Sequence, residues 1–71
     1  MKEIKDLIYD LIFSENTEYQ IDVHDYISDI YKYDKFIDDI KSILKKSKVS
    51  IVKEKRTANS KSFIWEIKVK K

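Results

Sequence analysis

The sequence predicts a single α+β domain, residues 1–71, in which three helices precede a C-terminal β-hairpin. Through the first 47 residues the apolar side chains recur every three or four positions, the spacing of helices that bury one face. From Lys48 onward apolar and polar residues alternate instead, which is the spacing of strands. A polar segment divides this alternating region in two. At this length only about 60% of the unfolded chain's surface becomes buried, so we expect a thin core.

The first helix is expected over about residues 2–13, where one stripe is apolar: Ile4, Leu7, Ile8, Leu11 and Ile12. Residues 18–21 then alternate briefly, enough for a short bridging strand or an extended linker. Asp22 fits the N-cap of a short second helix through about residue 31, with apolar positions at Val23, Ile27, Ile30 and Tyr31. Its exposed side would collect Asp22, Asp25 and Asp29.

The third helix is expected over about residues 34–47, because its apolar face is well spaced: Phe36, Ile37, Ile40, Ile43 and Leu44. In the first hairpin strand, Val49, Ile51 and Lys53 alternate against Ser50, Val52 and Glu54. In the second strand, Phe63 and Trp65 share a face that should pack over the helices. The loop between them, residues 55–61, contains Asn59, the residue best able to adopt a positive φ in a chain without glycine.

Charge is divided unequally along the chain. Residues 1–40 carry eleven acidic residues and four lysines, a net charge of −7, whereas residues 41–71 carry eleven Lys or Arg and two glutamates, a net charge of +9. The boundary falls inside the third helix, between Asp39 and Lys41. A basic half of this kind is a candidate surface for a polyanion.

The order helix, extended segment, helix, helix, hairpin resembles the winged-helix variant of the helix-turn-helix. Its best local part is residues 36–51, which look like a recognition helix running through a polar turn into the first wing strand. Family members often have glycine in that turn, where this chain has Ser47 and Lys48. The resemblance implies a nucleic-acid-binding or protein-binding module, with the third helix and the hairpin wing as contact elements.

Acids at the start of the third helix, Asp34, Asp38 and Asp39, would be repelled by phosphates, which moves the expected contact toward the wing. We therefore expect binding of DNA, favoured over RNA, in a transcriptional or replication regulator. The expected contact residues are Lys41, Ser42, Lys45, Lys46, Lys48, Lys53, Lys55, Arg56, Asn59 and Lys61. A charged hairpin loop that serves only solubility is the competing interpretation for the wing. Lys68, Lys70 and Lys71 are expected in a disordered tail that adds nonspecific attraction.

The alternative is a protein-interaction module, such as a small adaptor or a viral inhibitor. It would present acids of the second and third helices to a basic partner: Asp22, Asp25, Asp29, Asp38 and Asp39. A single module would hold nucleic acid weakly, which suggests a homodimer formed through the first helix or the tyrosine-bearing segments. The tyrosines would close the edges of the core, or Tyr31 and Tyr33 would form part of a partner patch.

Several classes of function are not expected. No glycine is present to build a phosphate-cradling loop, and His24 has no nucleophile pattern beside it, so we expect no enzyme, no cofactor and no catalytic residue. The aspartates lack the ligand turn of a calcium loop, so no metal is expected. Without cysteine or a long apolar run, the chain is expected in the cytoplasm, or in the nucleus of a eukaryotic or virus-infected cell, and not in a membrane.

Overall fold

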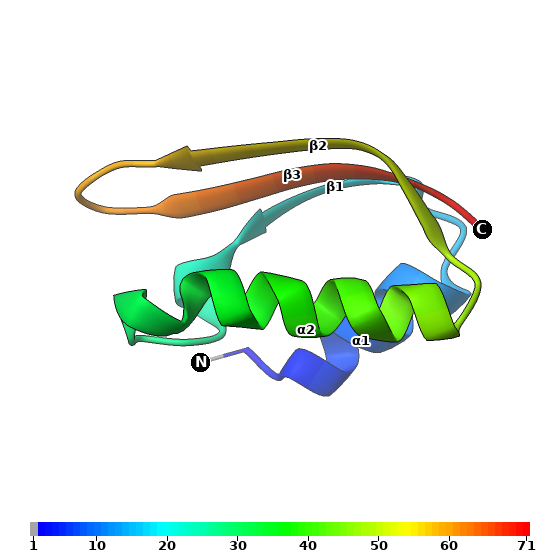
Figure 1. Ribbon diagram of the computed structural model, residues 1–71, viewed down its shortest axis with the longest axis horizontal. Coiled ribbons are helices and arrows are strands. Elements are labelled where there is room, and N and C mark those ends of the chain that lie inside the picture. Colours follow the sequence, from blue (N-terminus) through cyan, green and yellow to red (C-terminus); the bar gives the residue numbers. More distant parts are fainter. Residues whose placement is uncertain (1) are drawn as a thin grey trace.

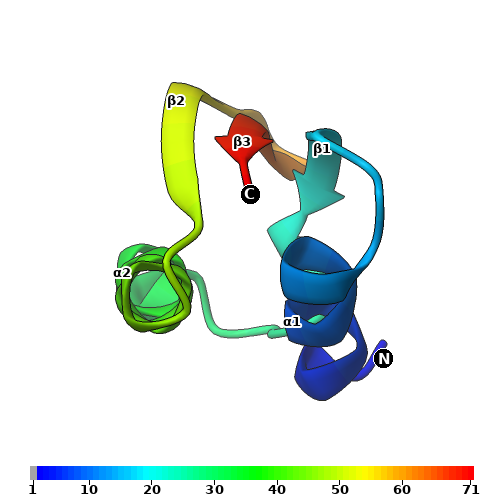
Figure 2. The same cartoon turned by 90° about the vertical axis from the view of Figure 1, so that its right-hand side faces the viewer.

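A computed structural model describes residues 2–71, which form one layer of helices under one layer of sheet (Figure 1). Helices α1 (Ile4–Phe13) and α2 (Tyr33–Lys46) both lie on the same face of the sheet. Strands β1 (Glu18–Asp22), β2 (Ser50–Ala58) and β3 (Phe63–Lys70) are antiparallel and ordered β1-β3-β2. Figure 2 shows β1 above α1 and β2 above α2, so the far face of the sheet is open.

The core lies between the helices and the inner face of the sheet. Its buried side chains come from all the main elements: Leu7, Leu11, Ile21, Val23, Tyr33, Phe36, Ile37, Ile40, Leu44, Val49, Trp65, Ile67 and Val69. Trp65, on the central strand β3, is completely buried, and Phe63 packs against the same cluster. The prediction that Phe63 and Trp65 pack over the helices is therefore confirmed.

The strongly periodic segments were predicted well. The first and third expected helices are α1 and α2, with ends that differ by one or two residues. The segment from residue 18 is a strand rather than an extended linker, because β1 pairs with β3 along its whole length. Within residues 2–71, no helix is both long and apolar enough to cross a membrane.

The predicted three-helix winged helix-turn-helix is wrong, although the α+β class is correct. The segment expected as the second helix forms two 3-10 turns, Val23–Asp25 and Ile30–Lys32. The side chain of Asp22 accepts a hydrogen bond from the His24 backbone N–H, and Asp29 accepts one from that of Tyr31, each at 3.0 Å. Aspartates that bond to the backbone in this way start short turns and compete with a continuous helix.

Burial does not favour a second helix either. Val23 is buried and Ile27 packs against the core, but Ile30 is 60% exposed and Tyr31 is 91% exposed, so the second half of the expected apolar face lies in solvent. Tyr33, in contrast, is buried, which rules out the partner patch that paired it with Tyr31. The hairpin is consequently not a wing beside three helices but two strands of a three-stranded sheet that covers two helices.

The hairpin loop is shorter than predicted. Strand β2 continues to Ala58, so Lys55 and Arg56 belong to the strand and only residues 59–62 form the loop. Asn59 does not adopt a positive φ. Its Oδ1 accepts hydrogen bonds from the backbone N–H groups of Lys61 (2.8 Å) and Ser62 (2.9 Å), an Asx turn that needs no glycine.

The predicted disordered tail is also wrong. Lys68 and Lys70 lie in β3, where both are paired in register with neighbouring strands. The Lys71 ammonium donates to the carbonyl oxygens of Ser14 (2.6 Å) and Asp10 (3.2 Å) at the end of α1. A cation there stabilises the helix, because the free carbonyl groups make the C-terminal end of a helix negative.

Helix α2 ends at a residue with a positive φ. Lys48 has φ 61°, the only positive value outside glycine in the described chain. The Val49 N–H donates to the Leu44 carbonyl (2.9 Å) and the Lys48 N–H to the Lys45 carbonyl (3.1 Å), the pair of bonds of a Schellman motif. Glycine usually takes this left-handed position, because a Cβ atom there is strained.

Replacing Lys48 with glycine should therefore stabilise the protein. We expect Lys48→Gly to raise the free energy of unfolding by about 1 kcal/mol, because the left-handed strain is relieved. Thermal unfolding followed by circular dichroism would measure the change. Lys48→Ala removes the same charge but keeps the strain, so equal stability of the two variants would contradict this account.

Candidate functional site

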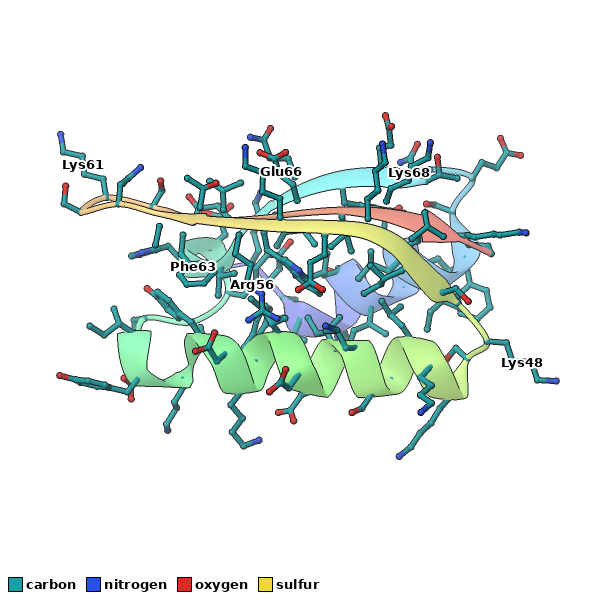
Figure 3. All side chains as sticks on the ribbon, turned by 45° about the horizontal axis from the view of Figure 1, so that its top comes forward. Lys48, Arg56, Lys61, Phe63, Glu66 and Lys68 are labelled. Atoms are coloured by element: carbon teal, nitrogen blue, oxygen red, sulfur yellow. The ribbon has the colours of Figure 1, made fainter. Side chains whose placement is uncertain are left out.

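A bulge in β2 decides which of its charged side chains face outward. The pairing with β3 shifts between Ile51 and Lys53, so Val52 has no partner in the register. Glu54 and Arg56 consequently lie on the inner face, and Figure 3 shows Arg56 between the sheet and α2. Lys53 and Lys55 belong to the outer face. The expected alternation, which grouped Lys53 with the inward Ile51, is therefore wrong.

Glu54 is the centre of a charged cluster between β2 and α2. Its Oε2 accepts a hydrogen bond from Lys41 Nζ (2.9 Å), and its Oε1 accepts from Arg56 Nε (2.9 Å) and from the indole Nε1 of Trp65 (3.2 Å). Arg56 Nη1 also donates to Asp34 Oδ1 on α2 (3.1 Å). The cluster thus joins α2, β2 and β3, and its side chains are partly exposed except for that of Asp34, which is 80% exposed.

The cluster changes the pKa of Glu54. Burial disfavours the charged carboxylate and acts to raise its pKa, but the hydrogen bonds from Lys41, Arg56 and Trp65, with the charge of Lys41, outweigh burial. The net result is a pKa below the ordinary value, so the carboxylate stays ionised to a lower pH than an unperturbed glutamate does. Because Lys41 and Arg56 are both hydrogen-bonded to Glu54, their charges are neutralised within the protein.

Other lysines gather where α2 ends, β2 begins and β3 ends. This group, called the basic end below, consists of Lys45, Lys46, Lys48, Lys53, Lys68 and Lys70. All six are exposed, and none forms an ion pair within residues 2–71. In Figure 3, Lys48 extends from this end and Lys68 stands on the open face of the sheet. Their charges are therefore available to an external anion.

Lysines oppose each other on the open face. Lys53 and Lys68 are direct cross-strand partners, and Lys70 lies opposite Ser50. Like charges in opposite positions of an antiparallel pair are destabilising. Glu18, on β1, is the other partner of Lys68, and Glu66 is the partner of Lys55. The acids thus border the basic end on the side of β1 and on the side of the hairpin tip.

A groove opens beside the end of α2. It has a volume of about 570 Å³ and is called the helix-end groove below. It is lined by Asp38, Lys41, Ser42, Leu44, Lys45, Lys48, Val49, Ser50 and Ile51. Four of the predicted contact residues, Lys41, Ser42, Lys45 and Lys48, therefore lie together, although Lys41 is paired with Glu54.

The structure does not bring the predicted wing residues to this site. Arg56 faces α2, and the Asn59 side chain holds the hairpin turn. Lys61 lies at the hairpin tip, at the opposite end of the sheet from Lys48 (Figure 3). Glu66 stands between Lys61 and Lys68 on the open face. The tip of the hairpin and the end of α2 therefore do not form one continuous contact surface.

Sequence reasoning missed Lys68 and Lys70 as ordered parts of the site. The signal was present, because both alternate with Ile67 and Val69, which are buried. In a strand, alternate residues point to opposite faces, so two buried neighbours place the lysines together on the open face.

The remaining candidates for chemistry are occupied within the fold. His24 Nε2 is hydrogen-bonded to the buried Tyr33 hydroxyl at 3.0 Å, and burial, with the charges of Asp22 and Asp29, raises the pKa of that hydroxyl. Among residues 2–71, no three His, Asp or Glu side chains gather as a metal site would require. Comparison with protein-family models, with curated proteins and with solved structures finds no match for this chain.

Replacing Glu54 with glutamine should destabilise the protein in a pH-dependent way. At pH 7 we expect Glu54→Gln to lower the free energy of unfolding by about 1–3 kcal/mol, the usual range for hydrogen bonds to a charged group. Because the folded pKa lies below the unfolded value of about 4.3, this stabilisation is complete above that pH and disappears as the pH falls through the folded value.

Urea unfolding at several values between pH 3 and pH 7 would measure the effect. Wild type and Glu54→Gln should differ most near neutral pH and converge in acid. Glu66→Gln removes a carboxylate from the open face and should keep the pH dependence of the wild type. A constant difference between wild type and Glu54→Gln across this range would contradict the assignment.

Proposed function

We propose that this chain binds nucleic acid, DNA in particular, by holding backbone phosphates at the basic end. The observation that carries the proposal is the group of six lysines without an internal ion pair in the described chain, set around one end of the molecule. Lysines on a strand pair and on an adjoining helix end can neutralise several phosphates at once. Such contacts release counterions and supply most of nonspecific affinity.

The arrangement favours phosphates over bases. The exposed aromatic residues of the described chain, Tyr9, Phe13 and Tyr31, belong to the helical layer and not to the open face of the sheet. Stacking of unpaired bases needs exposed rings among the cations. At the start of α2, Asp34 is bound to Arg56 and Asp39 to Lys35, so this turn offers little to base edges. The proposed contact is therefore with a duplex backbone, largely independent of sequence.

The acidic surface has less support as a partner site. Asp22 and Asp29 begin 3-10 turns, Asp25 pairs with Lys2 at 3.2 Å, and Asp39 pairs with Lys35 at 2.7 Å. These acids have local structural roles, and Asp38 is the one member of the predicted set whose side chain forms neither a hydrogen bond nor an ion pair within residues 2–71.

Fluorescence anisotropy with a labelled DNA duplex tests the proposal. With about five phosphate contacts, the logarithm of the association constant should fall with the logarithm of salt concentration with a slope of about −4 to −5. Lys48→Glu with Lys68→Glu should lower affinity about 100-fold at low salt, because two contacts become repulsions. The affinities for single-stranded DNA and for duplex RNA, measured in parallel, would show whether binding depends on a duplex and on deoxyribose.

Two charge reversals serve as controls. Lys61→Glu changes the hairpin tip, and Lys32→Glu changes the start of α2, so each alters net charge without touching the basic end. Each should lower affinity only a few-fold through the general field of the protein. Affinity that is absent at low salt, or lost as strongly in Lys61→Glu as in the double variant, would refute the proposed site.

A further inference from the structure

Helix α1 presents an exposed aromatic pair that the core does not use. Tyr9 is 66% exposed and Phe13 is 69% exposed, and their ring centroids are 4.9 Å apart. Asp6 and Asp10 each precede one of these rings by three residues, which places them beside the pair on the helix surface. Neither aspartate forms an ion pair within residues 2–71. These four residues are called the aromatic-acidic face below.

The helix-end groove has the complementary character. Leu44, Val49 and Ile51 form its apolar lining, in which Ile51 is half-buried and the other two are core residues, and Lys45 and Lys48 contribute unpaired cations. Its volume of about 570 Å³ is ample for an aromatic side chain. An apolar lining with lysines fits a ligand that carries an aromatic ring next to carboxylates. The aromatic-acidic face of α1 has this composition.

We propose that the aromatic-acidic face of one copy of this chain docks into the helix-end groove of a second copy. The aromatic rings would cover the apolar lining, and Asp6 and Asp10 would approach Lys45 and Lys48. Burial of apolar area and attraction between opposite charges both favour this occupant. A basic partner is disfavoured at the groove by its lysines, and a neutral one leaves the charges of both surfaces unmatched.

This contact joins two different surfaces, so it is head-to-tail. The dimer keeps one free groove on one copy and one free aromatic-acidic face on the other, so the assembly can grow beyond a dimer. One face of a ten-residue helix covers far less than the roughly 800 Å² per partner of a standard interface. Association should therefore be weak, appear at high protein concentration and decrease with salt.

The inference does not rest on the proposed binding of nucleic acid. The two share Lys45 and Lys48, however, so a bound duplex and a second copy would compete for these side chains. Measurements of self-association are accordingly made on the protein alone. A protein that does not self-associate would leave the nucleic-acid proposal standing. A protein that does not bind DNA would likewise leave the self-association proposal standing.

Sedimentation equilibrium at low salt tests the inference with two variants. The wild-type mass should rise above the 8.6 kDa of the monomer as concentration increases toward about 1 mM, the range of weak contacts. Phe13→Ser removes the aromatic ring and Lys45→Glu reverses a charge of the groove, and both positions are exposed, so the fold should tolerate each change. Each variant alone should remain monomeric.

An equimolar mixture of the two variants gives the decisive result. Phe13→Ser keeps its groove and Lys45→Glu keeps its aromatic-acidic face, so the mixture should form 1:1 dimers that do not grow. Lys32→Glu, with the same charge change away from the groove, should associate like the wild type. A wild type that stays monomeric, a Lys45→Glu variant that associates normally, or a mixture that stays monomeric would each overturn the proposal.

Discussion

The carboxylate of Glu54 holds the sheet against α2. It lies on the inner face of an edge strand and is bonded to Lys41 of α2, to Arg56 two residues further along β2, and to the indole of Trp65 at the centre of the core. A buried indole N–H without a partner would be costly, and so would a half-buried carboxylate. Each group satisfies the other, and the lysine and arginine neutralise the remaining charge. The large ring of Trp65 can therefore fill the core of a 71-residue protein without leaving a polar atom unbonded.

Where apolar spacing was strong and local, the sequence predicted the fold correctly. Helix α2 has five buried residues on one stripe, and packing reinforces that pattern. The second helix failed because Asp22 and Asp29 each start a separate short turn, and each of these side chains bonds to a backbone N–H two residues on. An aspartate before an apolar run predicts the start of a turn, but it does not say whether the turn continues as a helix. A turn continues as a helix when its apolar face is buried, and here Ile30 and Tyr31 remain exposed.

The charged site was only partly predictable, because one residue reverses the alternation of β2. In an unbroken strand, Arg56 would share the outward face with Ser50, and Lys53 would point inward with Ile51. The bulge at Val52 exchanges these sets, and no glycine or proline marks its position. Its advantage is visible only in three dimensions, since it brings Glu54 within reach of Trp65 and turns two lysines outward. Arg56, one of the predicted contact residues, thereby becomes a structural residue.

The same bulge places Lys53 and Lys55 on the open face of the sheet, where neither forms an ion pair within residues 2–71. Six of the eleven acids in residues 1–40 start a 3-10 turn or form an ion pair within the described chain, whereas the lysines of β2 and β3 lie on a face where Glu18 and Glu66 are their acidic partners in register. Lys53 directly opposite Lys68 is an unfavourable pair in the free protein, and Glu18 on the other side of Lys68 is the only carboxylate of the described chain paired in register with either lysine. An anion between them would relieve this repulsion, so a ligand bound at this position would be favoured by the strain it removes as well as by its own charge. In the proposed complex, a bound phosphate would offset the repulsion between the two lysines.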